Sequence, residues 1–154
     1  VGSAVNRAAG SQFWKKFLVT SSDVTVAQKA LSGVASGDLI VAKVVFQTDS
    51  TGLAGMTNFE LGVSGEAYGP NLPVVEAASN LGASAIRIAP HPSTFADTTN
   101  DNGMTVTAAV PFLLEAGDSL QYSGSSSAGT GAGVVAISIL FERLADNADI
   151  ESAV

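Results

Sequence analysis

His91 is the single histidine of this 154-residue chain, and the chain has no cysteine. Zinc sites built from several histidines, or from histidine together with cysteine, are therefore excluded. A serine triad would need His91 as its base. That residue lies between Pro90 and Pro92, and no Gly-x-Ser-x-Gly elbow leads from a strand into a helix. We expect His91 to be a loop or interface residue rather than a catalytic base.

Segment 97–103 carries oxygen-bearing side chains that could approach a calcium ion. The spacing fails the EF-hand pattern, because the first ligand position falls on Thr98 and no glutamate follows at the required distance. The residue types are those of an exposed turn or hairpin loop. We therefore expect loop contacts here and leave calcium binding open. The candidate residues are Asp97, Asn100, Asp101 and Asn102.

Two further patterns, a glycine-rich run and the acidic residues, could in principle form a phosphate-binding or catalytic site, but neither indicates a particular reaction. The glycine-rich run 124–133 lacks the Gly-Lys-Ser/Thr ending of a P-loop and precedes a strand pattern, so we interpret it as a long loop. The 14 acidic residues could supply a catalytic pair, but no spacing nominates two of them. We predict a protein without a cofactor and without enzymatic activity. A hydrolase on a β scaffold is the third-ranked alternative.

An aromatic cluster surrounds two lysines near the start of the chain. On a strand, Phe13 and Phe17 would share one face and Trp14 would lie on the other, so one face must serve something besides the core. Tryptophan is favoured at protein interfaces. The segment Phe13, Trp14, Lys15, Lys16 and Phe17 is therefore a candidate interface. The alternative is that Trp14 only covers the edge of the domain.

The composition points to a surface that is partly hidden. The chain is 46% hydrophobic and 14% charged, whereas ordinary soluble domains carry about 25% charged residues. We therefore expect a subunit that buries part of itself against other copies. A net charge of −7 argues against direct binding to nucleic acid or anionic lipid. No apolar run is long enough to cross a membrane.

The elements that must position these residues are mostly strands. Apolar and polar residues alternate along many short segments that are separated by Gly, Ser, Asn, Asp and Pro. This pattern predicts an all-β sandwich, of the jelly-roll type, with about eight or nine antiparallel strands. One short helix is expected at 73–80, between Pro73 and Gly82. The predicted strands are 13–20, 24–29, 38–49, 58–64, 84–89, 104–110, 112–115, 119–123 and 133–144.

Two long segments should form the centre of the core. In 38–49 we predict that Ile40, Ala42, Val44 and Phe46 share the buried face. In 133–144 the corresponding face holds Val135, Ile137, Ile139 and Phe141. Gly37-Asp38 and Gly117-Asp118 each precede a strand, and we interpret both as tight corners.

The chain divides into three parts. Residues 1–12 form a flexible N-terminal arm, residues 13–144 the sandwich, and residues 145–154 an acidic C-terminal tail. Both ends could reach a neighbouring subunit and become ordered on binding. The alternative is that both ends are frayed.

The order of these segments resembles small jelly-roll subunits of tailed-phage virions. The likeness is in the arrangement of an N-terminal arm, a strand led by Gly-Asp, the run Val110-Pro-Phe-Leu-Leu-Glu-Ala-Gly-Asp-Ser-Leu-Gln-Tyr122 and a long closing strand. It is a resemblance of pattern that covers roughly residues 13–144. The outline is also similar to trimeric jelly rolls of the tumour-necrosis-factor and complement-C1q type, although this chain lacks the aromatic-rich core of the C1q type. The resemblance implies a virion structural protein, a homotrimer that decorates or stabilises the capsid or forms part of a fibre or tail. Its expected partner is the major capsid protein or another virion protein.

The alternative function is a receptor- or carbohydrate-binding tip module of a phage tail fibre. Its site would lie on loops carried by a rigid β scaffold, which is a common arrangement for binding residues. Its candidate contacts lie on the loops around Tyr68, around residues 91–102 and around residues 123–131.

Overall fold

The computed structural model describes residues 6–56, 58–64, 73–77, 81–90, 111–124 and 127–154, with the backbone alone for 73–77. In this part of the chain there are nine β-strands and one 3-10 turn. The strands are β1 (Gln12–Thr20), β2 (Lys29–Ala30), β3 (Leu39–Thr48), β4 (Phe59–Ser64), β5 (Pro73–Ala77), β6 (Ile86–Ala89), β7 (Phe112–Leu114), β8 (Ser119–Ser123) and β9 (Val134–Arg143), and the turn is η1 (Ser21–Asp23).

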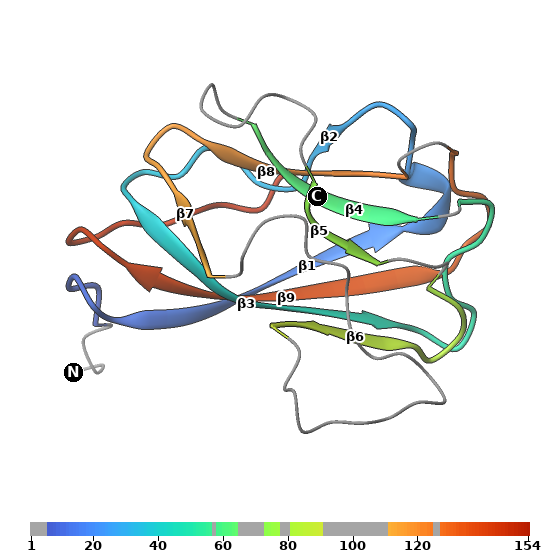
Figure 1. Ribbon diagram of the computed structural model, residues 1–154, viewed down its shortest axis with the longest axis horizontal. Coiled ribbons are helices and arrows are strands. Elements are labelled where there is room, and N and C mark those ends of the chain that lie inside the picture. Colours follow the sequence, from blue (N-terminus) through green and yellow to red (C-terminus); the bar gives the residue numbers. More distant parts are fainter. Residues whose placement is uncertain (1–5, 57, 65–72, 78–80, 91–110, 125–126) are drawn as a thin grey trace, which may run out of the picture.

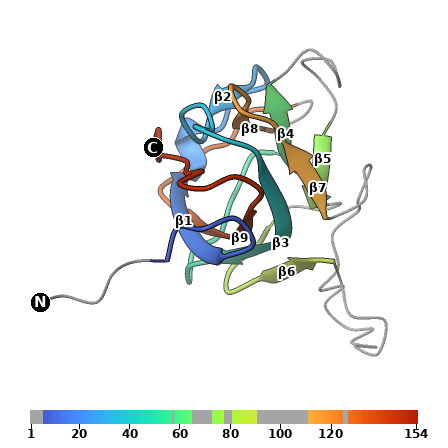
Figure 2. The same cartoon turned by 90° about the vertical axis from the view of Figure 1, so that its left-hand side faces the viewer.

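The strands form two antiparallel sheets, which are the two layers of Figure 1 and are seen from one end in Figure 2. Sheet A has five strands in the order β1-β9-β3-β6, with β7 also paired to β3. Sheet B has four strands in the order β2-β8-β4-β5. If β7 is set aside, every connection crosses from one sheet to the other except the one between β4 and β5, and the two four-stranded orders are those of an eight-stranded jelly roll. The all-β jelly-roll sandwich expected from the sequence is therefore confirmed.

Alternation along β9 explains the centre of the core. Every second residue of this strand is buried, and the predicted face of Val135, Ile137, Ile139 and Phe141 is confirmed. Strand β9 lies between β1 and β3, so sheet A buries its longest strands in its middle. Across the sandwich, the rings of Phe46 on β3 and Phe59 on β4 meet edge to face, with 5.2 Å between their centroids.

Strand β3 departs from the predicted alternation because it contains a β-bulge. Its pairing with β9 shifts at Ala42, so the buried positions are odd-numbered before this residue and even-numbered after it. The predicted common face of Ile40, Ala42, Val44 and Phe46 was therefore wrong for the first two. One inserted residue moves the following side chains to opposite faces. The bulge leaves Lys43 exposed on the side away from sheet B.

The expected helix at 73–80 was wrong for the residues that the structure describes. Residues 73–77 form β5, the edge strand of sheet B beside β4. Proline lacks an N–H and fits the first position of an edge strand, and β-branched Val74 and Val75 favour extended backbone. Of the predicted strand 24–29, only Lys29 is in a strand, β2. The predicted strand 104–110 lies outside the described residues.

The two Gly-Asp corners precede β3 and β8, as predicted, and they also contact each other. The Asp38 carboxylate accepts a hydrogen bond from the Ala116 amide at 2.9 Å. The Gly117 amide donates to the Ala35 carbonyl at 2.9 Å. Gly117 has φ +93°, a conformation that glycine adopts without a steric penalty. The repeated Gly-Asp pattern therefore marks one end of the sandwich, where the chain turns into β3 of sheet A and into β8 of sheet B.

The described parts of both chain ends pack on the sandwich. The Gly10 amide donates to the Arg143 carbonyl at 2.6 Å, and Arg7 forms an ion pair with Asp149 at 3.2 Å. Ala148 and Ile150 are buried in the core. The expected division into an arm, a body and a tail therefore needs correction: residues 6–12 and 145–154 belong to the folded domain. Residues 1–5 lie outside the described part.

Candidate assembly surface

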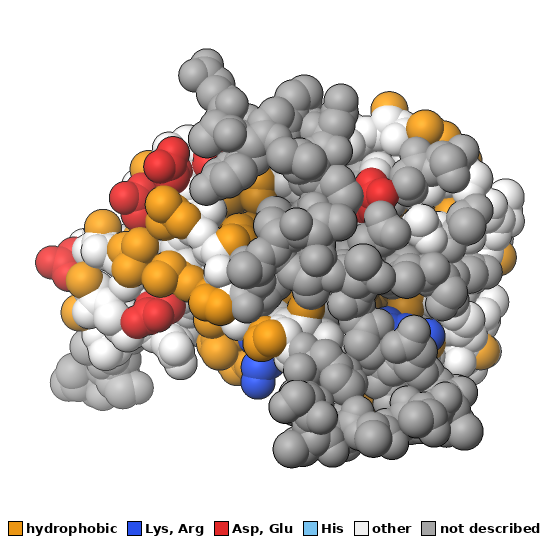
Figure 3. All heavy atoms as spheres, viewed as in Figure 1, with side chains coloured by type: hydrophobic (Ala, Val, Ile, Leu, Met, Phe, Trp, Pro, Cys, Tyr) orange, Lys and Arg blue, Asp and Glu red, His pale blue; other side chains and the backbone are white. Residues whose placement is uncertain are grey.

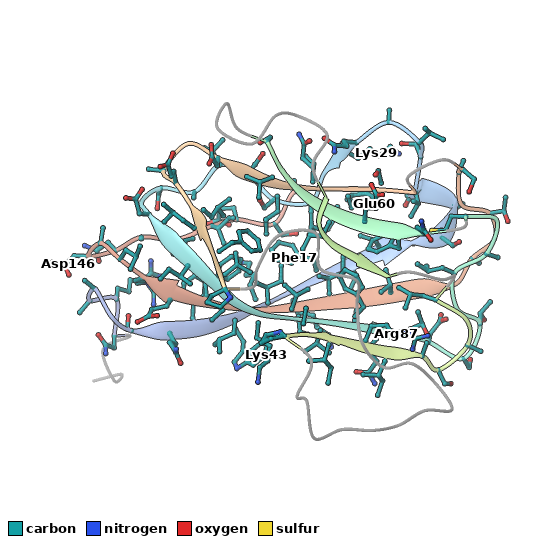
Figure 4. The ribbon with its side chains drawn as sticks, in the orientation of Figure 1. Phe17, Lys29, Lys43, Glu60, Arg87 and Asp146 are labelled. Atoms are coloured by element: carbon teal, nitrogen blue, oxygen red, sulfur yellow. The ribbon has the colours of Figure 1, made fainter. Side chains whose placement is uncertain are left out.

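Strand β1 presents opposite faces to the core and to solvent. Phe17 is 1% exposed and lies between the two sheets, as Figure 4 shows, whereas Trp14 is 55% and Leu18 58% exposed. Phe13 is partly buried and stacks on Phe141 with 5.2 Å between ring centroids. The predicted separation of the aromatic residues is confirmed. Strand β1 is long, and among the described strands it pairs with β9 alone.

Rows of neighbouring side chains extend the exposed face of β1 across sheet A. Trp14 lies opposite Leu140, which lies opposite Lys43. Side chains directly opposite each other on one face are about 4.5–5.5 Å apart at Cβ. A second row, apolar except for Gln47, runs across β1, β9, β3 and β6, and Ile86 at its end is 42% exposed. That row is Leu18, Ala136, Gln47 and Ile86.

We call this surface the outer face of sheet A. Between these two rows lies a third, formed by Lys16, Ser138, Val45 and Ile88. Its residues on β3 and β6, Val45 and Ile88, are apolar. An exposed apolar surface that spans several strands is typical of an interaction site. The outer face of sheet A consists of Trp14, Lys16, Leu18, Lys43, Val45, Gln47, Ile86, Ile88, Ala136, Ser138 and Leu140.

The charges on this face are basic. Lys16 and Lys43 are exposed, and Figure 4 shows Lys43 on the side of sheet A that points away from sheet B. Lys15 alternates to the other side of β1 and is half-buried. Of the five predicted interface residues, the structure therefore places Trp14 and Lys16 on the outer face. Phe13, Lys15 and Phe17 face the interior side of the strand.

Arg143 ties the chain ends to this sheet. The side chain is buried, its Nε donates to the Ala148 carbonyl at 2.8 Å, and one terminal nitrogen lies 3.2 Å from the Ser11 hydroxyl. Its guanidinium carbon is 4.2 Å from the centre of the Phe13 ring, a cation–π geometry. A buried charge needs such partners. Arg143 therefore holds the segment before β1 against the turn after β9.

The outward face of sheet B is polar and built from small side chains. The hydroxyls of Ser64 and Ser119 are hydrogen-bonded across β4 and β8. The Ser123 hydroxyl donates to Glu60 at 3.4 Å on the same pair of strands. Gln121 lies opposite Gly62 between them. In this described part of sheet B, the exposed large apolar side chains found on sheet A have no counterpart.

Acidic residues gather at the end of the sandwich where the Gly-Asp corners meet. Asp38 and Asp118 belong to those corners. Asp149 lies beside the first corner, where its carbonyl accepts a hydrogen bond from the Ser36 amide, and its carboxylate forms an ion pair with Arg7. Figures 3 and 4 show the acidic side chains at this end, with Asp146 at its tip. Exposed Leu144 and Val34 are close by in the chain. We call Asp38, Glu115, Asp118, Asp146 and Asp149 the acidic end.

Two titrating groups are shifted by local structure. The Asp49 carboxylate accepts hydrogen bonds from the amides of Gly52 at 2.8 Å and Thr51 at 3.0 Å. These bonds, above all the bond from Gly52, lower the pKa of Asp49. Burial, and next the negative charge of Asp23, raise the pKa of Tyr122. Neither group lies on the outer face of sheet A.

The loop candidates lie outside the described residues. They are Tyr68, His91, Asp97, Asn100, Asp101 and Asn102, so calcium binding at 97–103 and glycan binding stay predictions. Within the residues that the structure does describe, no group of three or more His, Cys, Asp or Glu side chains could hold a metal ion. Over the same residues, no helix has the length and apolar character needed to span a bilayer.

Sequence reasoning missed most of the outer face. Leu18 follows Trp14 by four residues and shares its face by simple alternation, so the period of β1 could have identified it. Leu140 and Ile86 could not be identified this way, because their position beside Trp14 and Leu18 depends on which strands become neighbours. The strand order of the jelly roll supplies that information.

Comparisons with known proteins add little. No protein-family model matches the chain, and no curated protein matches it. Among solved structures, a chain from the structure of infectious bursal disease virus, Gx strain, is a weak match with 16% identity and a TM-score of 0.20. The match covers 95% of this chain and 37% of the viral chain. A similarity this weak carries no argument about function.

Proposed function

We propose that this protein is a non-enzymatic structural subunit of a virion, a capsid decoration or head-stabilising protein that self-associates and binds the assembled shell. The observation that carries the proposal is the outer face of sheet A, where Trp14, Leu18 and Ile86 are exposed together. This surface leaves large apolar side chains in water in the single chain. Covering it with another subunit would stabilise the assembly by removing apolar area from water.

The virion part of the proposal is an argument by analogy from the fold. Jelly rolls recur in viral capsid proteins, lectins and cupins, and fold alone does not assign function. A metal site built from several histidines, as a cupin-like enzyme would need, is excluded by the single histidine of this chain. A lectin-like site would use loops, and the loop residues predicted for it lie outside the described part. The capsid analogy agrees best with an exposed and largely apolar sheet face.

The proposed mechanism is binding without chemistry. A subunit that binds only the assembled shell stabilises that shell by RT ln(1 + [L]/Kd), which is about 2.7 kcal/mol at a hundredfold excess over Kd. The sandwich suits this role because the long strands β3 and β9 carry the outer face of sheet A on one side and bury their other side in the core. The core therefore holds the outer face in place. A preformed surface loses little conformational entropy on binding.

The test is co-sedimentation with purified virion shells of the source virus. The wild-type protein should pellet with the shells, and Trp14→Ala/Leu18→Ser should remain in the supernatant. Ser119→Ala/Gln121→Ala, on the polar face of sheet B, is the matched control and should pellet like the wild type. Equal pelleting of the Trp14/Leu18 variant would overturn the role of the outer face. Absence of wild-type protein from the pellet would overturn the virion role.

A further inference from the structure

We propose that the outer face of sheet A binds the acidic end of a second copy of this chain, in a head-to-side interface. This inference rests on the proposed self-association and adds which surfaces meet. The two surfaces differ in charge and lie on different sides of the molecule. The outer face lies along the lower side of the sandwich in Figure 1, whereas the acidic end is the left-hand end, where Asp146 lies in Figure 4.

The outer face supplies the basic, apolar half of the contact. Lys16 lies in the row that contains Ser138, and Lys43 lies in the row that contains Leu140. No acidic residue lies in the three rows that make up this face. Glu142, the nearest carboxylate along β9, lies in the row beyond Trp14, opposite Gln12. The face therefore carries positive charge in a protein whose net charge is −7.

The acidic end supplies the complementary half. Of its five carboxylates, Asp149 is paired with Arg7, while Glu115 and Asp146 are exposed. Arg143, the other cation there, is buried beneath the surface. Leu144 is exposed beside Asp38, to whose carbonyl its amide donates. An exposed leucine among carboxylates is the chemical complement of lysines among exposed apolar side chains.

The charges favour a head-to-side contact over packing of two identical faces. Two outer faces packed together would bring lysines of the same sign into one interface, which opposes association. Joining the face to the acidic end pairs opposite charges and excludes water from apolar groups on both sides. Because the two surfaces differ, the contact repeats from copy to copy and closes as a ring if the rotation allows it. A homotrimer is one such ring.

A charge-exchange experiment tests the pairing by light scattering over a concentration series. Lys16→Glu/Lys43→Glu changes the face, and Glu115→Lys/Asp118→Lys changes the acidic end. Each pair should raise the dissociation constant about tenfold or more, because like charges then face each other. The quadruple variant carries both changes and should recover wild-type association. Lys29→Glu/Gln121→Glu, at and beside the β2 edge of sheet B, is the control and should leave association unchanged.

The outcomes separate this inference from the proposed function. If the face variant dissociates but the acidic-end variant associates normally, and the quadruple variant is not rescued, the head-to-side pairing is wrong while self-association through sheet A stands. If the wild type is monomeric at every concentration, the proposed self-association itself fails. Rescue in the quadruple variant supports the pairing, since a structural defect would not be repaired by two further charge reversals.

Discussion

Sheets A and B contribute to one core, but the residues on their outward faces differ. The outer face of sheet A carries Trp14, Leu18 and Ile86 with two lysines, whereas the outward face of sheet B carries hydrogen-bonded serines, Gln121 and Glu60. Folding alone does not require this difference, since either sheet could keep a polar outward face. This contrast is the reason for proposing that a protein partner binds sheet A rather than sheet B.

We expect the largest effect on stability when substitutions on the two faces of one strand, β9, are compared. Ile139 of β9 is fully buried, so Ile139→Ala should lower the free energy of unfolding by about 2–5 kcal/mol. Leu140 lies next to it on the outer face, and Leu140→Ala should cost about 1 kcal/mol or less in the monomer. Urea unfolding at low protein concentration measures both. Equal losses would mean that the outer face is part of the core.

The next largest effect is expected on self-association, when substitutions on sheet A are compared with substitutions on sheet B. Trp14→Ala/Leu18→Ser removes exposed apolar side chains from sheet A and should weaken self-association at least about tenfold, since loss of about 1.4 kcal/mol of binding free energy is a factor of ten. Ser119→Ala/Gln121→Ala on sheet B should leave it unchanged. Sedimentation velocity at matched concentrations provides the comparison. A similar loss in both variants would remove the distinction between the sheets.

An effect smaller than that of Ile139→Ala is expected where the chain ends join sheet A. Arg143→Met should leave the Ala148 carbonyl and the Ser11 hydroxyl without their present donor, at a cost of about 1–3 kcal/mol. Amide exchange should become faster in residues 6–11 and 145–150, while the centre of β9 stays protected. Uniform acceleration across β9 would show instead that Arg143 supports the whole sheet.

The smallest effect is a pH dependence at the turn after β3. Hydrogen bonds from Gly52 and Thr51 lower the pKa of Asp49 below the value of 3.8 for an unperturbed aspartate. The folded state therefore releases this proton more readily than the unfolded state. The stabilisation is present above pH 3.8 and is lost as the pH falls through the lowered folded pKa.

Melting temperatures of the wild type and Asp49→Asn, measured from neutral pH down to strongly acidic pH, isolate this contribution. The advantage of the wild type over the variant should shrink as the solution becomes acidic. An advantage that stays constant over the whole range would contradict the role of the charged carboxylate.

Alternation was enough to predict the all-β fold and the buried face of β9, because a strand with one buried face has period two wherever its partners lie. The bulge at Ala42 could not be read from the sequence, since its apolar neighbours fit either face equally well. The strand β5 was mistaken for a helix because a proline is compatible with the first position of either element.

The candidate surface could be predicted only in part. Trp14 stood out because a tryptophan opposite two phenylalanines cannot share their face. Its neighbours Leu140 and Ile86 come from segments far away in the sequence, and only the strand order brings them together. The ends of the chain were misjudged for a similar reason. The chain ends contact Arg143 and the Gly-Asp corners over long distances in the sequence, and such contacts cannot be predicted from composition.

The account depends most on whether the outer face of sheet A becomes buried when the protein associates. Trp14 is the single tryptophan of the chain and lies on that face, 55% exposed. Its fluorescence and acrylamide quenching should therefore be followed with the light-scattering mass across one concentration series. We predict that emission moves to shorter wavelength and quenching falls as the mass rises. A rising mass with unchanged Trp14 emission and quenching, or a monomer at every concentration, would contradict the account.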